Sequence, residues 1–221
     1  MLLTSVAFWG AVELGLLYAI MALGVYITFR ILNFPDLTVD GSFVTGASIS
    51  AVMIVAGYSP AVSVIFAFAG GFLAGAATGL LHTKGKINAL LSGILMMIAL
   101  YSINLRIMGK ANIPLLGETT LFPAEKIYWF GVCAVVWIMP VVVFVIKLVI
   151  DWFLHTDIGL ALRATGDNQR MIRSFGVNTD STIVLGVSLS NGLVALSGAL
   201  VAQYSGYSEV SMGVGMIIIG L

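Results

Sequence analysis

Side chains that could do chemistry are sparse in this chain of 221 residues, and many of them gather in two polar stretches. The first, residues 33–42 (NFPDLTVDGS), carries two carboxylates, Asp36 and Asp40, four residues apart. The second, residues 151–180, is the longest polar run and holds three of the ten basic residues. Acids at this spacing and grouped arginines suit helix capping, ion pairing or contact with a partner, so both stretches are candidates for function.

Signatures of enzyme chemistry are missing from the sequence. It has no G-x-x-x-x-G-K-[ST] phosphate loop, no G-x-S-x-G nucleophile turn and no H-E-x-x-H pair. The two histidines, His82 and His155, stand far apart, and there is a single cysteine. We therefore expect no metal, no cofactor and no ATP bound by this chain itself. Transport, or a scaffold or receptor role, remains.

Residues 33–42 have two interpretations. On a helix, Asp36 and Asp40 would share one face. Pro35 and Gly41 punctuate the segment, as in a broken or re-entrant stretch that lines a cavity. The alternative is an ordinary cytoplasmic turn in which Asp36 or Asp40 caps the next helix. Under the first interpretation, the residues that line a path are Asn33, Phe34, Asp36 and Asp40.

Residues 151–180 predict two short helices. The run IGLALRAT (158–165) favours a first helix, which Gly166 interrupts. Asp167 is a good N-cap for a second helix that runs through Phe175, and Gly176 fits the position just after its end. The two helices would give this polar run a defined surface.

The second of these helices has an apolar side and a polar side. Met171, Ile172 and Phe175 fall on the apolar side. The polar side chains available to a partner or to water are Asn168, Gln169, Arg170 and Arg173. The alternative is a basic retention loop with an interfacial helix, since arginines accumulate on the cytoplasmic side of membrane proteins.

The elements that position these stretches are membrane spans. Hydrophobic residues make up 60% of the chain and charged residues 9%, whereas soluble domains carry about 25% charged residues. The mean hydropathy is +1.08. A formal net charge of zero argues against nucleic acid as a partner. The chain is therefore expected to be an integral membrane protein in contact with lipid.

The apolar runs predict an all-α, polytopic transmembrane helical bundle. A bilayer core needs about 20 apolar residues in a helix, and continuous runs favour helices over barrel strands. The predicted spans are 9–29, 43–57, 61–81, 88–108, 129–150 and 182–204, with a seventh starting near Gly213. The short second span suggests a tilted or re-entrant segment. We treat residues 1–221 as one transmembrane domain, and we expect further residues beyond its apolar end.

Lysine and arginine set the orientation. With alternating spans, one side of the membrane receives Arg30, Lys84, Lys86, Lys147, Arg163, Arg170 and Arg173. The other side receives Arg106, Lys110 and Lys126. The richer side is predicted to be the cytoplasm, which places residues 151–180 inside the cell and the N-terminus outside.

Polar and small residues inside the spans predict contacts between helices. Glu13, Asn104, Asn191 and Gln203 are costly at membrane depth unless they face protein or water. Interhelical hydrogen bonding explains them, and Asn191 is also the best candidate to line a path. Small residues recur every four positions in three rows: Ala67-Gly71-Gly75-Gly79, Ser42-Gly46-Ser50 and Asn191-Ala195-Ala199. Such rows favour close helix packing.

The run GLALRATGDNQRMIRSFGVNTD (159–180) resembles the coupling segment of ABC importer permeases of the branched-chain amino acid type. That family has R-A, then an acidic residue, then a short helix ending in (L/F)-G-(I/V)-N-T-D. Arg163-Ala164, Asp167 and the run 175–180 match this pattern. The opening stretch 15–43 also resembles the family. Its variant at 33–43 resembles a subgroup associated with tryptophan, tyrosine and related amino acids.

The resemblance implies a mechanism for a multi-pass protein of the bacterial plasma membrane. Two permease subunits, here a homodimer, would enclose the path. Separate ABC ATPase subunits would bind ATP, and an extracytoplasmic binding protein would deliver an amino acid. The residues implied in coupling to the ATPase are Arg163, Ala164, Gly166, Asp167, Asn168, Arg170, Arg173, Phe175 and Gly176. Asn191 joins the four residues from 33–42 as a candidate for the translocation path.

Three alternatives stay open at the level of sequence. An ion-driven secondary transporter would use Glu13, Asp36 or Asp40. An ABC permease could instead carry a sugar or another small solute, because selectivity in such systems rests mostly on the external binding protein. A scaffold or receptor subunit would bind a partner without any flux.

Overall fold

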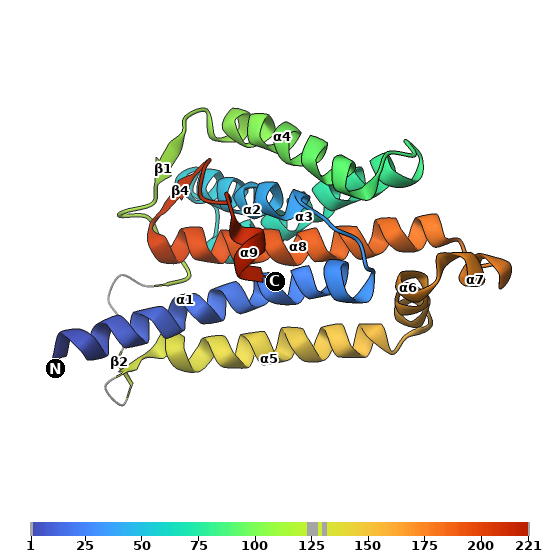
Figure 1. The fold of residues 1–221 in the computed structure, drawn as a ribbon. Helices are drawn as coiled ribbons and strands as arrows, with labels where there is room; N and C mark the ends of the chain where they lie inside the picture. Colours follow the sequence, from blue (N-terminus) through green and yellow to red (C-terminus); the bar gives the residue numbers. More distant parts are fainter. Residues whose placement is uncertain (1, 123–127, 130–131, 221) are drawn as a thin grey trace.

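The computed structural model describes residues 2–122, 128–129 and 132–220. Within them, six helices are long and apolar enough to cross a membrane (Figure 1). The elements in chain order are α1 (Leu2–Tyr26), the π-helix η1 (Ile27–Ile31), α2 (Thr38–Val55), α3 (Pro60–Thr83), α4 (Ala89–Met108), β1 (Asn112–Pro114), β2 (Tyr128–Trp129), β3 (Val132–Cys133), α5 (Ala134–Leu154), α6 (Asp157–Asp167), α7 (Gln169–Ser174), α8 (Thr179–Ser205), β4 (Tyr207–Glu209) and α9 (Met216–Gly220).

The predicted helical bundle is confirmed, and each of the six predicted spans corresponds to one long helix. Three starting points differ by five residues or more, and α1 begins at Leu2 rather than at residue 9. α2 begins at Thr38 rather than at residue 43, because the stretch after Leu37 is already helical. α5 begins at Ala134 rather than at residue 129, since β2 and β3 pair just before it. Lys126, predicted on the less basic side, lies outside the described residues.

Helix α8 is the centre of the bundle, with α1, α2 and α3 packed around it. In its most apolar stretch 78% of the residues are buried, against 17% for α5. Small residues permit this approach. A Cβ atom on Gly46 would lie 1.8 Å from the carbonyl oxygen of Ala195, and one on Gly75 would lie 2.5 Å from that of Val187. The close packing predicted from the small-residue rows is therefore confirmed.

The segment between η1 and α2 turns back into the bundle (Figure 1). Asn33 takes a φ of +52°, a conformation that asparagine tolerates better than most residues. The amide of Phe34 donates to the carbonyl of Thr28 at 2.9 Å, which closes the turn. The chain then reaches Asn191, near the middle of α8, before α2 begins. α2 therefore starts inside the bundle and not at its end.

The two ends of the bundle differ in charge and structure. One end holds α6, α7, the end of η1 and the turn between α3 and α4 (Figure 1). At or near it lie the basic residues predicted to be cytoplasmic: Arg30, Lys84, Lys86, Lys147, Arg163, Arg170 and Arg173. At the opposite end β1 pairs with β4, and the chain then returns to α9, which packs against α1 and α2.

Candidate functional site

Helix α6 is held against the bundle by its small residues. Thr156 caps it by accepting a hydrogen bond from the amide of Gly159 at 3.3 Å. The prediction that Gly166 interrupts the helix is wrong, because α6 continues through it to Asp167. A Cβ atom on Gly166 would lie 2.0 Å from the carbonyl oxygen of Ile31. Gly166 thus serves the contact between α6 and η1 and does not end the helix.

Helix α7 is closed at both ends. Its N-cap is Asn168, whose Oδ1 accepts from the amide of Met171 at 3.1 Å, so the prediction of Asp167 as the cap is wrong. Asp167 instead closes α6, which runs further than expected. At the other end Gly176 has a φ of +84°, and its amide donates to the carbonyl of Arg173 at 3.0 Å. The predicted glycine stop is confirmed.

The outer face of α7 is exposed and partly apolar. No residue of α7 is buried, and the exposed fractions are 55% for Met171 and 71% for Phe175, which follows the helix. Arg163 and Arg170 are exposed as well, and neither forms an ion pair with a described residue. We call Arg163, Arg170, Met171 and Phe175 the coupling surface. Exposed apolar side chains beside arginines are typical of a protein interface.

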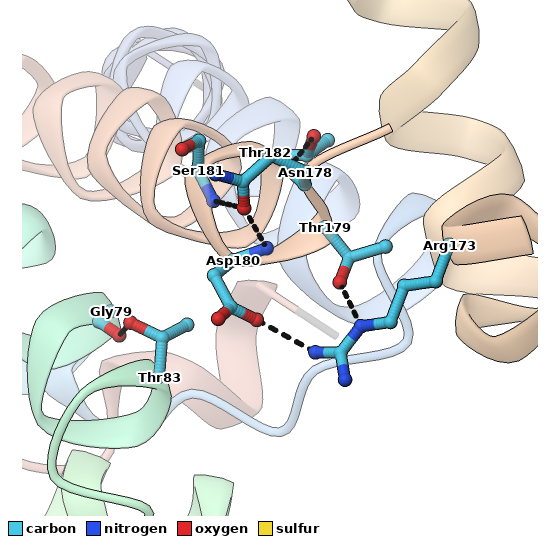
Figure 2. A network of polar contacts seen from close by, with 8 residues as sticks. All are labelled: Gly79, Thr83, Arg173, Asn178, Thr179, Asp180, Ser181 and Thr182. Carbon is cyan, nitrogen blue, oxygen red and sulfur yellow. Dashed lines mark hydrogen bonds and ion pairs between the residues drawn. The ribbon is translucent and has the colours of Figure 1, made fainter. Parts of the chain in front are cut away.

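Arg173 ties α7 to α8 (Figure 2). Its Nε donates to Thr179 Oγ1 at 2.6 Å, and its Nη2 donates to Asp180 Oδ1 at 2.7 Å. Thr179 is buried, whereas Asp180 is exposed. The sequence placed Arg173 toward a partner or water. It stays partly exposed, but its guanidinium is engaged with the first turn of α8 because the 174–178 connection folds back on itself.

Asn178 caps the start of α8. Asn178 Oδ1 accepts from the amides of Asp180, at 3.1 Å, and Ser181, at 3.3 Å (Figure 2). Beside it, a cavity of about 480 Å³ opens between the ends of α3 and α8. Thr83, Lys84, Asp180 and Ser181 are among its polar lining residues. This end of α8 is therefore both fixed to α7 and accessible.

We call residues 32–37, between η1 and α2, the re-entrant segment. A buried polar cluster joins this segment to the middle of α8. Asn191 Nδ2 donates to Asp36 Oδ2 at 2.6 Å, and Ser42 Oγ donates to Asn191 Oδ1 at 2.6 Å. Asp36, Ser42 and Asn191 are fully buried. The other oxygen of Asp36 accepts from the amide of Thr38, the first residue of α2, at 2.8 Å. The structure thus brings together two predicted path residues from distant parts of the chain.

Asp40 points to a different partner. Its carboxylate accepts hydrogen bonds from the amides of Gly215, at 3.0 Å, and Ile217, at 2.9 Å. The predicted shared helical face of Asp36 and Asp40 is wrong, since Asp36 precedes α2 and bonds to α8 while Asp40 bonds to the segment that enters α9. Asn33 is exposed, and Phe34 packs edge-to-face on His82 with ring centroids 5.2 Å apart.

Sequence reasoning missed the hydrogen bond of 2.9 Å that Thr38 and Thr78 share between α2 and α3. It predicted interhelical hydrogen bonding for Gln203, which is confirmed, but not the partners. Gln203 donates to Ser50 at 2.9 Å, and Ser50 bonds to Ser63 at 3.0 Å. Ser50 lies in one of the predicted small-residue rows, so hydroxyl groups within such rows were the available signal. Among the described residues, no group of three or more His, Cys, Asp or Glu side chains could hold a metal ion.

These features define a polytopic membrane protein with an exposed helical surface at its basic end. The family described as "Branched-chain amino acid transport system / permease component" matches residues 10–221, and the chain belongs to this family. It is therefore a permease of the ABC importer type, a multi-pass protein of the bacterial plasma membrane. Because the chain belongs to this family, the ABC permease replaces the two alternatives of an ion-driven secondary transporter and a scaffold or receptor subunit.

Three relatives give the range of similarity. The tyrosine transport system permease protein of Clostridioides difficile (strain R20291) is 49% identical over 212 residues, covering 94% of this chain and 68% of that protein. An uncharacterized protein of Rickettsia prowazekii is 37% identical, covering 96% and 73%. The ribose import permease protein of Escherichia coli K12 is 26% identical, covering 89% and 61%. No solved structure matches the chain.

Proposed function

We propose that the coupling surface is the docking site of a separate ABC ATPase, which hydrolyses ATP for this permease. The observation that carries the proposal is the exposure of Met171 on α7 and of Phe175 directly after it, because Arg173 fixes this helix to α8. Leaving apolar side chains in water is unfavourable, and a partner that covers them gains that free energy. Arg163 and Arg170 supply donors for acidic groups on the same partner.

The remaining residues of the coupling segment support this surface from behind. Ala164 and Gly166 are half-buried, and Gly166 packs on η1. Asn168 caps α7, and Gly176 ends it. Because these groups position the helix, their role in coupling is to hold α7 in the correct place for docking.

We also propose that the transported solute is an amino acid, with aromatic amino acids as the first candidates. The support is the 49% identity with a protein named a tyrosine transport permease, against 26% to 29% with permeases named for ribose and galactofuranose. A homodimer would enclose the path. An extracytoplasmic binding protein would deliver the solute at the end that holds β1 and β4.

The test is reconstitution of the permease with its ATPase and binding protein in lipid vesicles. Replacing Met171 and Phe175 together by Ser should lower the amount of co-purified ATPase by about tenfold, since the loss of two apolar contacts corresponds to at least ~1.4 kcal/mol. Uptake of labelled L-tyrosine should fall in parallel. Leu116→Ser is the matched control, because Leu116 is 87% exposed at the opposite end.

Two results would contradict these proposals separately. Unchanged co-purification of the ATPase with the double variant would remove the docking site from α7. Uptake of labelled ribose in place of L-tyrosine or L-leucine by the wild-type vesicles would remove the amino acid assignment and leave docking intact.

A further inference from the structure

We propose that Asp36 and Asn191 form the joint through which α8 moves the start of α2 during transport. In this arrangement α8 carries the displacement of α7 into the middle of the bundle. Asp36 and Asn191 act as positioning residues for the re-entrant segment 32–37. The inference rests on the proposed docking of the ATPase at α7.

The first step is the connection between α7 and α8. Arg173 bonds both to Thr179 and to Asp180, the first two residues of α8. Asn178 caps the same turn through two backbone amides. A movement of α7 is therefore passed to the end of α8 by these side-chain contacts and not by a loose loop (Figure 2).

The second step is the continuity of α8. Its 27 residues form one unbroken helix of about 40 Å at ~1.5 Å per residue. No proline interrupts it. Val184 and Val187 pack directly on Gly79 and Gly75 of α3, so the two helices are in close contact along this length. α8 is thus suited to move as a rigid body together with α3.

The third step is the contact at Asn191. This one side chain bonds to Asp36 in the re-entrant segment and to Ser42 in the first turns of α2. Both bonds measure 2.6 Å, and all three residues are fully buried. Hydrogen bonds between buried polar groups in a low-dielectric site are strong, and an unpaired partner there is costly. Asn191 therefore holds the segment on both sides of the point where α2 begins.

The segment 32–37 is the part that such a joint would move. It is not helical, and Asn33 turns it with a positive φ. Its backbone bonds to the rest of the chain, from Leu32 and Phe34, lie at its start, beside η1. Towards its end it is held by Asp36 and by the bond between Thr38 and Thr78 of α3. A shift of α8 and α3 would therefore carry the start of α2 with it.

The test exchanges the side chains of Asp36 and Asn191. In the N191D variant α8 loses the amide that donates to Asp36 and to the carbonyl of Val187, so the joint should open. In the D36N/N191D variant the new amide at position 36 still accepts from Thr38 and donates to the new carboxylate on α8, so the joint should close again. We measure the amount of permease in the membrane, ATPase co-purification and uptake of labelled L-tyrosine in vesicles with the ATPase and binding protein.

We expect N191D to lower uptake by about tenfold with ATPase co-purification unchanged, and D36N/N191D to recover most of it. The matched control is Ser190→Ala. Ser190 is the neighbour of Asn191 on α8, equally buried, but it donates to Gly24 of α1 at 2.7 Å. It should leave uptake near the wild-type value. If N191D does not reach the membrane, D36N replaces it in the comparison with the double variant.

The outcomes are distinguishable. Normal uptake in N191D, or in D36N where N191D is not made, would overturn the joint. So would a double variant that is abundant in the membrane, binds the ATPase and transports no better than the single variant. Failure of the underlying docking proposal looks different, because the ATPase would then bind equally well with and without Met171 and Phe175.

Discussion

At the scale of single residues, the exposed polar contacts orient α7, whereas the buried ones also stabilise the fold. The side chains of Arg173 and Asp180 are 59% and 53% exposed, and ion pairs in such surroundings contribute about 0–1 kcal/mol. Asn191 and Asp36 are fully buried, and loss of one partner there leaves a buried group unpaired at a cost of about 1–3 kcal/mol or more. Arg173 therefore sets the direction of α7, while Asn191 and Asp36 also stabilise the bundle.

Gly176 offers a prediction at this scale. Its φ of +84° is a left-handed conformation, which costs residues with a Cβ about 1–2 kcal/mol. We expect Gly176→Val to displace the end of α7 and to lower L-tyrosine uptake several-fold, with the spans intact. Gly176→Asn is the control, because asparagine tolerates this conformation and should cause a smaller loss. Equal uptake of both variants and wild type in vesicles would contradict the prediction.

At the scale of elements, the sequence predicts helices better than their exact ends. The six long helices follow from apolar runs, and Asn178 and Gly176 follow from local capping rules. Gly166 was misread because helix propensity counts a glycine as a breaker. The contact with Ile31 that explains this glycine joins residues far apart in the sequence. Asp167 and Asn168 are both good caps, and the choice depends on where α6 ends.

For the buried polar cluster, the sequence indicated which residues to consider but not which of them bond to one another. Asp36 and Asn191 were each expected in the path, but no local pattern pairs residues this far apart in the sequence. Four-residue spacing suggested one face for Asp36 and Asp40, which requires a helix that already includes Asp36. The helix begins at Thr38 instead, and the two carboxylates form hydrogen bonds to different segments. Tertiary packing determines which groups Asp36 and Asp40 bond to, and the spacing of the two residues in the sequence does not show it.

The packing of α2 on α8 gives a prediction for a whole element. A Cβ atom on Gly46 would lie 1.8 Å from the carbonyl oxygen of Ala195, so Gly46→Ala must push the helices apart. We expect a loss of about 1–3 kcal/mol of stability, as for other overpacked sites, seen as a lower Tm of the purified protein. Gly15→Ala is the control, since nothing lies within 4 Å of that position. A Gly46→Ala protein as stable as Gly15→Ala would refute the packing argument.

At the scale of the whole molecule, the re-entrant segment and the coupling surface are linked through one helix. The chain enters the segment 32–37 from the end that carries α6 and α7, and it leaves through α2 toward the end that carries β1 and β4 (Figure 1). α8 contacts both the segment and α7. A permease built this way can receive a displacement at one end and change its interior without rearranging every helix.

This arrangement makes a prediction about orientation. Basic residues accumulate on the cytoplasmic side, so the end with α6 and α7 should face the cytoplasm. With Cys133 replaced by Ser, we expect Gln169→Cys to react with a membrane-impermeant maleimide only after the cells are opened. Glu118→Cys, at the opposite end, should react on intact spheroplasts. Both positions are exposed, so access depends on the side of the membrane and not on burial. Labelling of Gln169→Cys on intact spheroplasts would reverse the orientation and would remove α7 from reach of any ATPase in the cytoplasm.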